Sequence, residues 1–225
     1  MYSLLVADDH PLFRDALQTV VSSGLANSQL LEAESLADAI TLVEQHTELD
    51  LLLLDLSLPD AEGLEGLTRL REEFPWLPVA IVSAHQERQL VLDAITLGAV
   101  GYIPKSTPRV ALLVALTQIL EGQLYLPPDI MRRPAPRVAS ASLTASAMAT
   151  SERLARLTEK QLAVLVCLTK GMSNKQIARE LSIAETTVKT HVSAILRKLN
   201  ATSRVHAIVI AGEEDLSFYQ AKLAH

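Results

Sequence analysis

The 225-residue sequence contains a single cysteine, Cys167, which excludes an internal disulfide and any metal site built from several cysteines. Cys167 lies at helical spacing among Leu162, Leu165 and Leu168, so we expect a buried core thiol rather than a reactive one. Long hydrophobic runs are also missing. Runs such as Leu51–Leu54 are far shorter than the roughly 20 apolar residues that a membrane span needs.

We also expect no secretory signal. The first residues, MYSLLVADDH, have no basic flank before the apolar run and reach two aspartates almost at once. We therefore expect a cytoplasmic protein without a membrane partner. Hydrophobic residues make up 49% of the chain and charged residues 20%, which is the composition of a folded protein, and the length of 225 residues suggests two compact units.

Basic residues are scarce in the first half of the chain. Residues 1–122 carry 18 acidic and 6 basic side chains, a net charge of −12, whereas residues 156–211 carry 9 basic and 3 acidic ones, a net charge of +6. A basic segment in an acidic protein indicates a polyanion as its partner, most simply nucleic acid. The alternative is a solvated charged face, which would give a smaller excess of basic residues.

Residues 1–122 alternate short apolar runs with longer amphipathic ones. Five strand-then-helix units predict a parallel sheet with helices on both faces, because parallel strands need crossover connections. The expected fold class is an α/β doubly wound domain with five parallel strands. The predicted strands are Ser3–Ala7, Leu30–Ala33, Leu51–Leu54, Val79–Val82 and Gly101–Ile103, and the predicted helices are 11–23, 36–45 (capped by Ser35), 63–74, 86–97 and 108–121.

The alternating pattern ends at residue 122. Residues 123–155 are rich in proline, alanine and serine, and we interpret them as a linker between two domains. Residues 156–211 contain four helical patterns separated by short turns, which predict an all-α unit. Capping-box spacing marks the start of its first two helices, with Thr158 and Gln161 in one and Ser173 and Gln176 in the other. The tail, 212–225, has no predicted structure.

Three carboxylates are expected at one edge of the sheet. Asp8 and Asp9 stand just beyond the first strand, and Asp55 ends the third. Ligands of such sheets bind at the carboxyl ends of the strands. Like charges that lie so close repel one another unless a cation holds them, and hard oxygen ligands with room for water suit Mg²⁺. Alternatively, Asp8 and Asp9 merely cap the first helix.

Two further polar side chains follow strand ends. Ser83 comes after the fourth strand and Lys105 after the fifth, which adds a hydroxyl and an ammonium to the carboxylates. Either residue alone would usually be a solvent-exposed side chain without a functional role. Three acids, a hydroxyl and a lysine in strand order are much harder to obtain by chance.

Through these residues, residues 1–122 resemble the flavodoxin-like receiver domain of two-component response regulators. The matching residues are Asp8, Asp9, Asp55, Pro59, Gly63, Ser83, Tyr102, Lys105 and Ser106. The resemblance implies that Asp55 accepts a phosphoryl group, whose oxygens Lys105 and Ser83 contact. It also implies that Mg²⁺ is held by Asp8, Asp9, Asp55 and the backbone carbonyl of Ser57.

The resemblance further implies a switch. Ser83 would turn towards the phosphoryl group, and Tyr102 would then move inward and reshape the neighbouring surface. The alternative is that Tyr102 is a half-exposed strand aromatic in both states.

The stretch NKQIARELSIAETTVKTHVSAILRKL predicts a helix, a turn and a second helix. One face of the second helix is an apolar stripe of Val188, Val192, Ile195 and Leu199, which we expect to be buried. The opposite face is polar, small and basic, as is typical of a helix that enters the major groove. It consists of Thr186, Lys189, Thr190, Ser193 and Arg197.

Residues 156–211 resemble the LuxR-type helix-turn-helix domain of NarL-type regulators, through LTEKQLAVL, GMSNKQIARELSIAETTVKTHVSAILRKL and SRVHAI. The resemblance implies base contacts by Lys189, Thr190 and Ser193. Candidates for phosphate contacts are Lys175, Thr187, Arg197 and Lys198. The last helix would offer Val205, Ile208 and Val209 as a dimer face, unless these residues simply close the small core. Ala184 departs from the family, because a capping Ser or Thr is favoured there.

Together the two resemblances predict a phosphorylation-dependent, DNA-binding transcriptional regulator. A histidine kinase would supply the phosphoryl group, and homodimers would bind paired half-sites. We do not expect an enzyme, because a phosphatase of the haloacid-dehalogenase type needs a second aspartate two residues after the nucleophile, where Ser57 stands. A regulator whose receiver serves only for dimerisation and a slow phosphatase are the alternatives.

Overall fold

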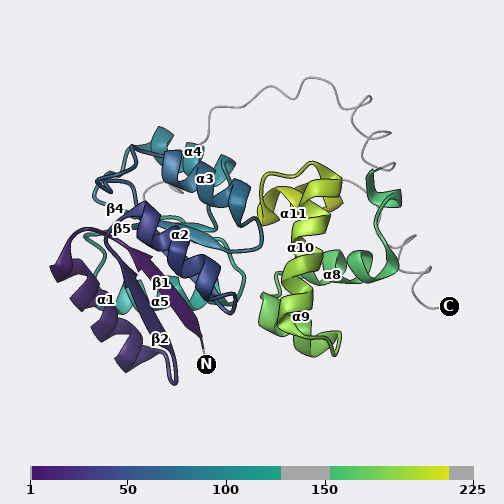
Figure 1. Cartoon of the computed structure of the whole chain (residues 1–225), viewed down its shortest axis with the longest axis horizontal. Helices are drawn as coiled ribbons and strands as arrows, with labels where there is room; N and C mark the ends of the chain where they lie inside the picture. The colour runs from purple at the N-terminus through teal and green to yellow at the C-terminus, as the bar shows by residue number, and fades with distance from the viewer. Residues whose placement is uncertain (1, 128–152, 213–225) are drawn as a thin grey trace. The chain divides into compact units, whose positions relative to one another are not determined.

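The structure is a computed structural model that describes residues 2–127 and 153–212. These residues form two compact units (Figure 1). The hydrophobic core clusters of the two units are separate. Within the described ranges, no helix combines the length and the hydropathy that crossing a membrane requires.

The first unit contains a five-stranded parallel sheet with the strand order β2-β1-β3-β4-β5. This finding confirms the predicted doubly wound fold. β2 lies on one side of β1, and β3, β4 and β5 follow on the other side. The carboxyl ends of β1 and β3 are therefore neighbours near the centre of the sheet. The strands are β1 (Ser3–Ala7), β2 (Gln29–Ala33), β3 (Leu51–Asp55), β4 (Val79–Ser83) and β5 (Gly101–Pro104).

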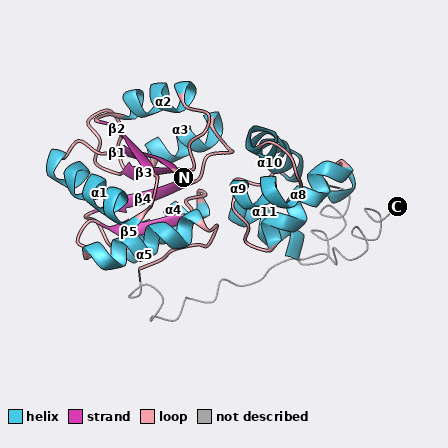
Figure 2. Ribbon diagram, turned by 90° about the horizontal axis from the view of Figure 1, so that it is seen from below, coloured by secondary structure: helices cyan, strands magenta, loops and turns pink. Residues whose placement is uncertain are grey.

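Five described helices of the first unit cover the two faces of this sheet, as Figure 2 shows. One apolar cluster packs α1 and α5 against one face, and a second packs α2, α3 and α4 against the other. The predicted order of strands and helices is therefore confirmed, with bounds that differ by at most two residues. The helices are α1 (Pro11–Gly24), α2 (Leu36–Gln45), α3 (Glu65–Glu73), α4 (Arg88–Thr96) and α5 (Arg109–Leu120).

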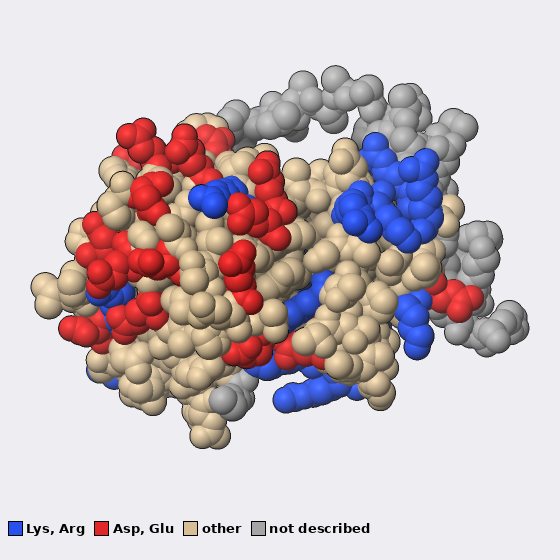
Figure 3. Space-filling model, in the orientation of Figure 1, with Lys and Arg blue, Asp and Glu red and all other residues tan. Residues whose placement is uncertain are grey.

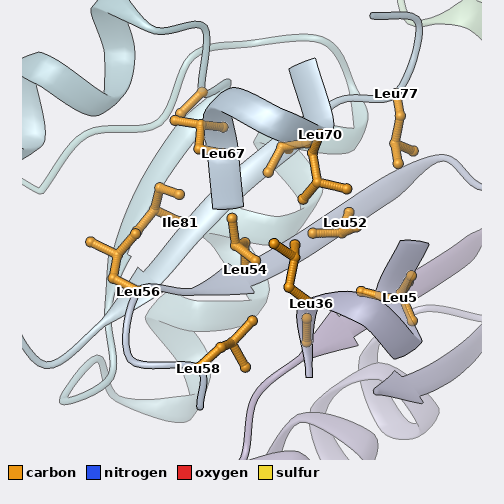
Figure 4. Close-up of a cluster of buried hydrophobic side chains, with 14 of the residues drawn as sticks. Leu5, Leu36, Leu52, Leu54, Leu56, Leu58, Leu67, Leu70, Leu77 and Ile81 are labelled. Atoms are coloured by element: carbon orange, nitrogen blue, oxygen red, sulfur yellow. The ribbon is translucent and has the colours of Figure 1, made fainter. Parts of the chain in front are cut away.

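The leucine run of β3 supplies both faces of the core. Leu52 and Leu54 belong to the cluster beneath α2, α3 and α4, whereas Leu51 and Leu53 belong to the cluster beneath α1 and α5. Figure 4 shows the first of these clusters, in which the side chains of the strand lie against leucines of α3. A strand with helices on both faces needs apolar residues at every position, not at every second one. The composition of β3 thus follows from its central place.

The loop after β3 is tied to the start of α2. The carboxylate of Asp60 accepts hydrogen bonds from the backbone amides of Leu36 (2.8 Å) and Ala37 (2.9 Å), and the Ser35 side chain accepts one from Asp38 N (3.1 Å). The first three amides of α2 therefore have acceptors. Partial burial favours a higher pKa for Asp60, but the amide hydrogen bonds outweigh it and hold the pKa below its ordinary value.

We expect Asp60→Ala to destabilise the first unit by about 1 kcal/mol, the typical value of a helix cap, which is a fall in Tm of roughly 4 °C. Because the pKa of Asp60 is lower in the folded state, its contribution is fully present above the unfolded-state pKa and is lost as the pH falls through the folded-state pKa. Thermal unfolding measured from pH 7 down to about pH 3 checks this, since the gap between wild type and variant should close in acid. The exposed Asp93→Ala is the matched control, and a gap that stays constant with pH would contradict the assignment.

The described structure extends both units beyond the predicted domain bounds. After α5 the chain returns to the edge strand β5, where Tyr125 forms a parallel bridge with Gly101. Tyr102 N donates to Tyr125 O (3.0 Å), and Tyr125 N donates to Val100 O (3.3 Å). In the second unit, Leu154 is 1% exposed and belongs to the core. Local composition alone assigns both segments to the linker, because it carries no information about such distant contacts.

The second unit consists of four described helices around one small core. The two predicted capping boxes are present at α8 and α9, and Ala184 gives α10 no side-chain cap. The predicted apolar stripe of α10 is buried at all four positions, and Cys167 is 4% exposed in the same core. The helices are α8 (Glu159–Thr169), α9 (Asn174–Glu180), α10 (Glu185–Leu199) and α11 (Arg204–Gly212).

Candidate functional site

The carboxyl edge of the sheet holds a buried cluster of opposite charges. Asp8 follows β1 and Asp55 ends β3, and both are almost fully buried. Lys105 follows β5, and its Nζ lies 2.8 Å from Asp8 Oδ2 and 2.8 Å from Asp55 Oδ2. Two carboxylates at this spacing require compensation, which one ammonium supplies only in part. The strand ends therefore converge as the sequence predicts.

The cluster has the chemistry of a divalent-cation site. Asp55 Oδ1 is buried and has no hydrogen-bond partner among the described residues, which is costly for a carboxylate oxygen unless a cation or a donor reaches it. Asp8, Asp9, His10 and Asp55 can each place one ligand atom so that all lie within 4.8 Å of one another. Three of these donors are carboxylate oxygens, so the donor set fits a hard cation such as Mg²⁺.

Lys105 is fixed from several sides. Its backbone amide donates to the carbonyl of Ser83 (2.8 Å), and its ammonium lies 5.2 Å from the centre of the Phe13 ring. Burial alone would lower the pKa of Lys105, but the hydrogen bonds and negative charges of Asp55 and Asp8 raise it above its ordinary value. The ammonium is therefore charged at neutral pH and aimed at Asp55.

Ser83 and Tyr102 lie on the neighbouring strands β4 and β5. Ser83 is fully buried at the last position of β4, where its Oγ accepts a hydrogen bond from His85 N (3.1 Å). Tyr102 is also fully buried, and its hydroxyl donates to the carbonyl of His85 (2.7 Å). The half-exposed position of Tyr102 is not observed, because the ring belongs to the core cluster that includes residues of α4. The inward movement of Tyr102 stays a prediction, and in this structure the ring already lies inside. Burial raises the pKa of Tyr102.

Sequence reasoning missed two residues of this site. His10 follows the acidic pair, and its Nδ1 lies 2.6 Å from Asp9 Oδ1. Arg14 is 7% exposed and donates to the carbonyl of Asp8 (2.7 Å), while its other nitrogens pair with acids at the end of β2. The adjacency of His10 to Asp8 and Asp9 is a signal that could have been used. The partners of Arg14 are far apart in the sequence, so no local sequence signal indicates that Arg14 belongs to the site.

The second unit presents part of its predicted polar face. On α10, Thr186, Thr187, Thr190 and Arg197 are exposed, and Ser193 is half-buried. Lys189 is only 5% exposed, and its ammonium lies 3.4 Å from a carboxylate oxygen of Glu185. A base contact by Lys189 requires it to become accessible, which the sequence pattern does not reveal.

The remaining predicted contacts are spread over the second unit. Lys175 on α9 is half-buried. Lys198 donates to the carbonyl of Arg156 (2.9 Å) and to Gln161 Oε1 (2.8 Å), so its ammonium helps to hold α8 and α10 together. Of the predicted dimer face on α11, Val209 is 55% exposed, Val205 is half-buried, and Ile208 packs partly against the core. Ile208 therefore serves the fold at least in part.

The two units differ in surface charge. On the face shown in Figure 3, acidic side chains spread over the first unit and basic side chains gather on the second. The difference matches the sequence counts and supports a polyanion as the partner of the second unit.

Comparisons with known protein families give a match for each of the two units. The family model for the response regulator receiver domain matches residues 4–117, and the model for bacterial regulatory proteins of the luxR family matches residues 155–211. The chain is a LuxR-type response regulator. This response regulator is 53% identical over 219 residues to the glycerol metabolism activator of Pseudomonas putida, covering 97% of this chain and 99% of the relative.

Other similar proteins match either most of this response regulator or one part of it. The nitrate/nitrite response regulator NarL of Escherichia coli strain K12 is 34% identical over 212 residues, which cover 94% of this chain and 95% of NarL. A LuxR family DNA-binding response regulator from Silicibacter pomeroyi has a TM-score of 0.52 and 32% identity, covering 57% of this chain and 99% of that one. The protein is accordingly a DNA-binding transcriptional response regulator with a receiver domain and a LuxR-type domain.

Proposed function

We propose that this response regulator accepts a phosphoryl group on Asp55 and that the modified receiver domain controls DNA binding. The observation that carries the proposal is the buried cluster at the carboxyl edge of the sheet, where Asp8 and Asp55 lie 2.8 Å from Lys105 Nζ. Asp55 Oδ1 is buried and has no hydrogen-bond partner among the described residues, which has few structural explanations, and a carboxylate can act as a nucleophile. Fixed charges around it suit phosphoryl transfer, which needs positioning and charge neutralisation.

The residues divide into three roles. Asp8, Asp9, Asp55 and the backbone carbonyl of Ser57 would hold Mg²⁺, which, when bound, would neutralise negative charge on the entering phosphoryl group. Asp55 would attack the phosphorus atom of the donor, and the donor's leaving group would depart. The charged Lys105 and the hydroxyl of Ser83 would then contact phosphoryl oxygens.

We further propose the partners. A sensor histidine kinase would be the phosphodonor, because a receiver domain implies such a partner. Homodimers, promoted by phosphorylation, would bind paired DNA half-sites in the cytoplasm. Thr190 and Ser193 would face the bases together with Lys189 once it is accessible, and Thr186 would lie on the same DNA-binding face. Lys175, Thr187, Arg197 and Lys198 would contact phosphates. Val205, Ile208 and Val209 would meet the partner.

The same site argues against an enzyme with rapid turnover. Ser57 occupies the position at which a phosphatase of the haloacid-dehalogenase type carries its second aspartate, so no carboxylic acid stands there to activate water. The aspartyl phosphate should therefore last long enough to act as a signal.

The proposal is tested by intact-mass measurement after incubation with acetyl phosphate. We expect one phosphoryl group per chain with Mg²⁺ and none with an excess of EDTA, because the uncompensated carboxylates would repel an anionic donor. Continued release of inorganic phosphate over many equivalents would instead favour a phosphatase. A folded protein that binds Mg²⁺ yet takes up no phosphoryl group would contradict the proposal.

A further inference from the structure

His10 stands beside the acidic cluster with one ring nitrogen turned towards it. Its Nδ1 lies 2.6 Å from Asp9 Oδ1, 3.1 Å from Asp8 Oδ1 and 3.9 Å from Asp55 Oδ2. Three carboxylates thus surround a single imidazole nitrogen. His10 Nδ1 is also 3.4 Å from Lys105 Nζ, so every charged group of the cluster lies around this atom.

The backbone holds the imidazole in this place. His10 is the residue before Pro11, which restricts it to extended backbone angles, and its φ of −95° and ψ of 104° agree. Its amide donates to Asp8 Oδ1 (2.9 Å), which fixes the loop between β1 and α1. Although His10 occupies the N-cap position of α1, its side chain does not cap the helix. The ring lies instead beside the carboxylates of Asp8 and Asp9.

The imidazole lies at the solvent boundary of the cluster. The His10 side chain is 61% exposed, whereas the side chains of Asp8 and Asp55 are 1% exposed. A hydrated cation that enters from solvent would meet the imidazole and Asp9 first and the buried carboxylates afterwards. Asp55 Oδ1, buried and without a hydrogen-bond partner among the described residues, independently indicates that the cluster receives a ligand.

We propose that His10 supplies Nδ1 as a nitrogen ligand to the divalent-cation site, which makes the site a mixed nitrogen and oxygen site that favours borderline cations. This inference rests on the proposed function, because it concerns the same cation site. Mg²⁺ prefers oxygen ligands and retains several waters, so it gains little from an imidazole. Co²⁺ and Ni²⁺ bind imidazole well and stand higher in the order of divalent affinities. His10 would then decide which cations compete with Mg²⁺ at the phosphoacceptor.

The test compares Mg²⁺ with Co²⁺ and Ni²⁺ by isothermal titration calorimetry on the full-length, untagged chain. His10→Asn replaces the imidazole with an amide, which keeps a hard oxygen donor and suits the N-cap position. We expect the variant to lose on the order of 10-fold or more in affinity for Ni²⁺ and Co²⁺, while its Mg²⁺ affinity changes by less than about 2-fold. The visible absorption of bound Co²⁺ should shift as well, because a nitrogen ligand is lost.

Two further variants identify the site. His46→Asn removes an imidazole whose Nδ1 lies 3.1 Å from one carboxylate oxygen of Glu48, outside the acidic cluster, and should leave all three affinities unchanged. Asp55→Asn should weaken the binding of all three cations, because each uses the same carboxylate. If Ni²⁺ binding survives Asp55→Asn but not His10→Asn, the cation binds elsewhere and the inference fails.

The inference and the proposed function fail in different ways. Equal Co²⁺ and Ni²⁺ affinities in wild type and His10→Asn, with normal Mg²⁺ binding and phosphoryl uptake, would overturn only the role of His10. In that case the imidazole is a hydrogen-bond partner of Asp9 and no ligand. Absence of Mg²⁺ binding and of a phosphoryl adduct in the wild type would overturn the proposed function instead.

Discussion

Asp55→Asn is expected to abolish phosphoryl uptake and to leave DNA affinity unresponsive to a phosphodonor. The amide that replaces the carboxylate is too weak a nucleophile to attack phosphorus, while the substitution preserves the size of the side chain. The ion pair of Asp55 with Lys105 is lost, but Lys105 keeps Asp8 as a partner at 2.8 Å. Intact mass with acetyl phosphate and Mg²⁺ gives the first readout, and titration of an operator fragment gives the second.

The control for this variant is Asp93→Asn, which makes the same chemical change at an exposed position of α4. It should take up one phosphoryl group as the wild type does. An adduct that persists in Asp55→Asn would move the acceptor to another residue. If the wild type is phosphorylated but binds DNA equally in both states, the receiver domain serves dimerisation only.

Ile195→Ala should unfold the DNA-binding domain and leave the receiver domain intact. Ile195 is fully buried in the only core cluster described for the second unit. Truncation of a large buried aliphatic side chain costs about 2 to 5 kcal/mol, which is most of the stability of a domain with roughly 60 residues. Specific DNA binding should disappear, whereas phosphoryl uptake at Asp55 should persist, because the two units have separate cores.

Arg197→Ala is the matched control on the same helix. Arg197 is exposed two positions after Ile195, so its removal should leave the unfolding temperature nearly unchanged. If Arg197 contacts a phosphate, DNA binding weakens and the slope of log K against log salt falls by about 1. Calorimetry and DNA titration together separate the two effects. Loss of phosphoryl uptake in Ile195→Ala would show that the units do not fold independently.

The fold was predictable because its two halves follow different periodicities. The central strands are buried on both faces, so runs such as Leu51–Leu54 stand out from the amphipathic helices around them. On α10, the apolar residues recur at helical spacing, and Val188 and Leu199 are fully buried as that spacing predicts. The convergence of Asp8, Asp55 and Lys105 followed from the topology of parallel strands alone.

The remaining features depend on contacts between residues distant in the sequence. Arg14 reaches the carbonyl of Asp8, Glu32 of β2 and Glu34 just after β2 only when the sheet has formed. Lys189 is buried, although helical spacing places it on the polar stripe that was predicted to be exposed. Helical spacing shows which residues share a face of the helix, but it does not show which of them neighbouring residues bury. Lys198, which has the sequence context of a phosphate contact, is bonded to Arg156 and Gln161 within the domain.

The bridge between Tyr125 and β5 also protects the receiver domain against self-association through its edge strand. β5 is the last strand of the sheet, and an edge strand offers unpaired amides and carbonyls to any strand that approaches. Tyr125 pairs with the amide of Tyr102 on this strand and with the carbonyl of Val100, the residue just before the strand. A receiver fragment cut at residue 122 would uncover this edge and tend to associate through it, whereas one that retains Tyr125 and Leu126 keeps the edge shielded.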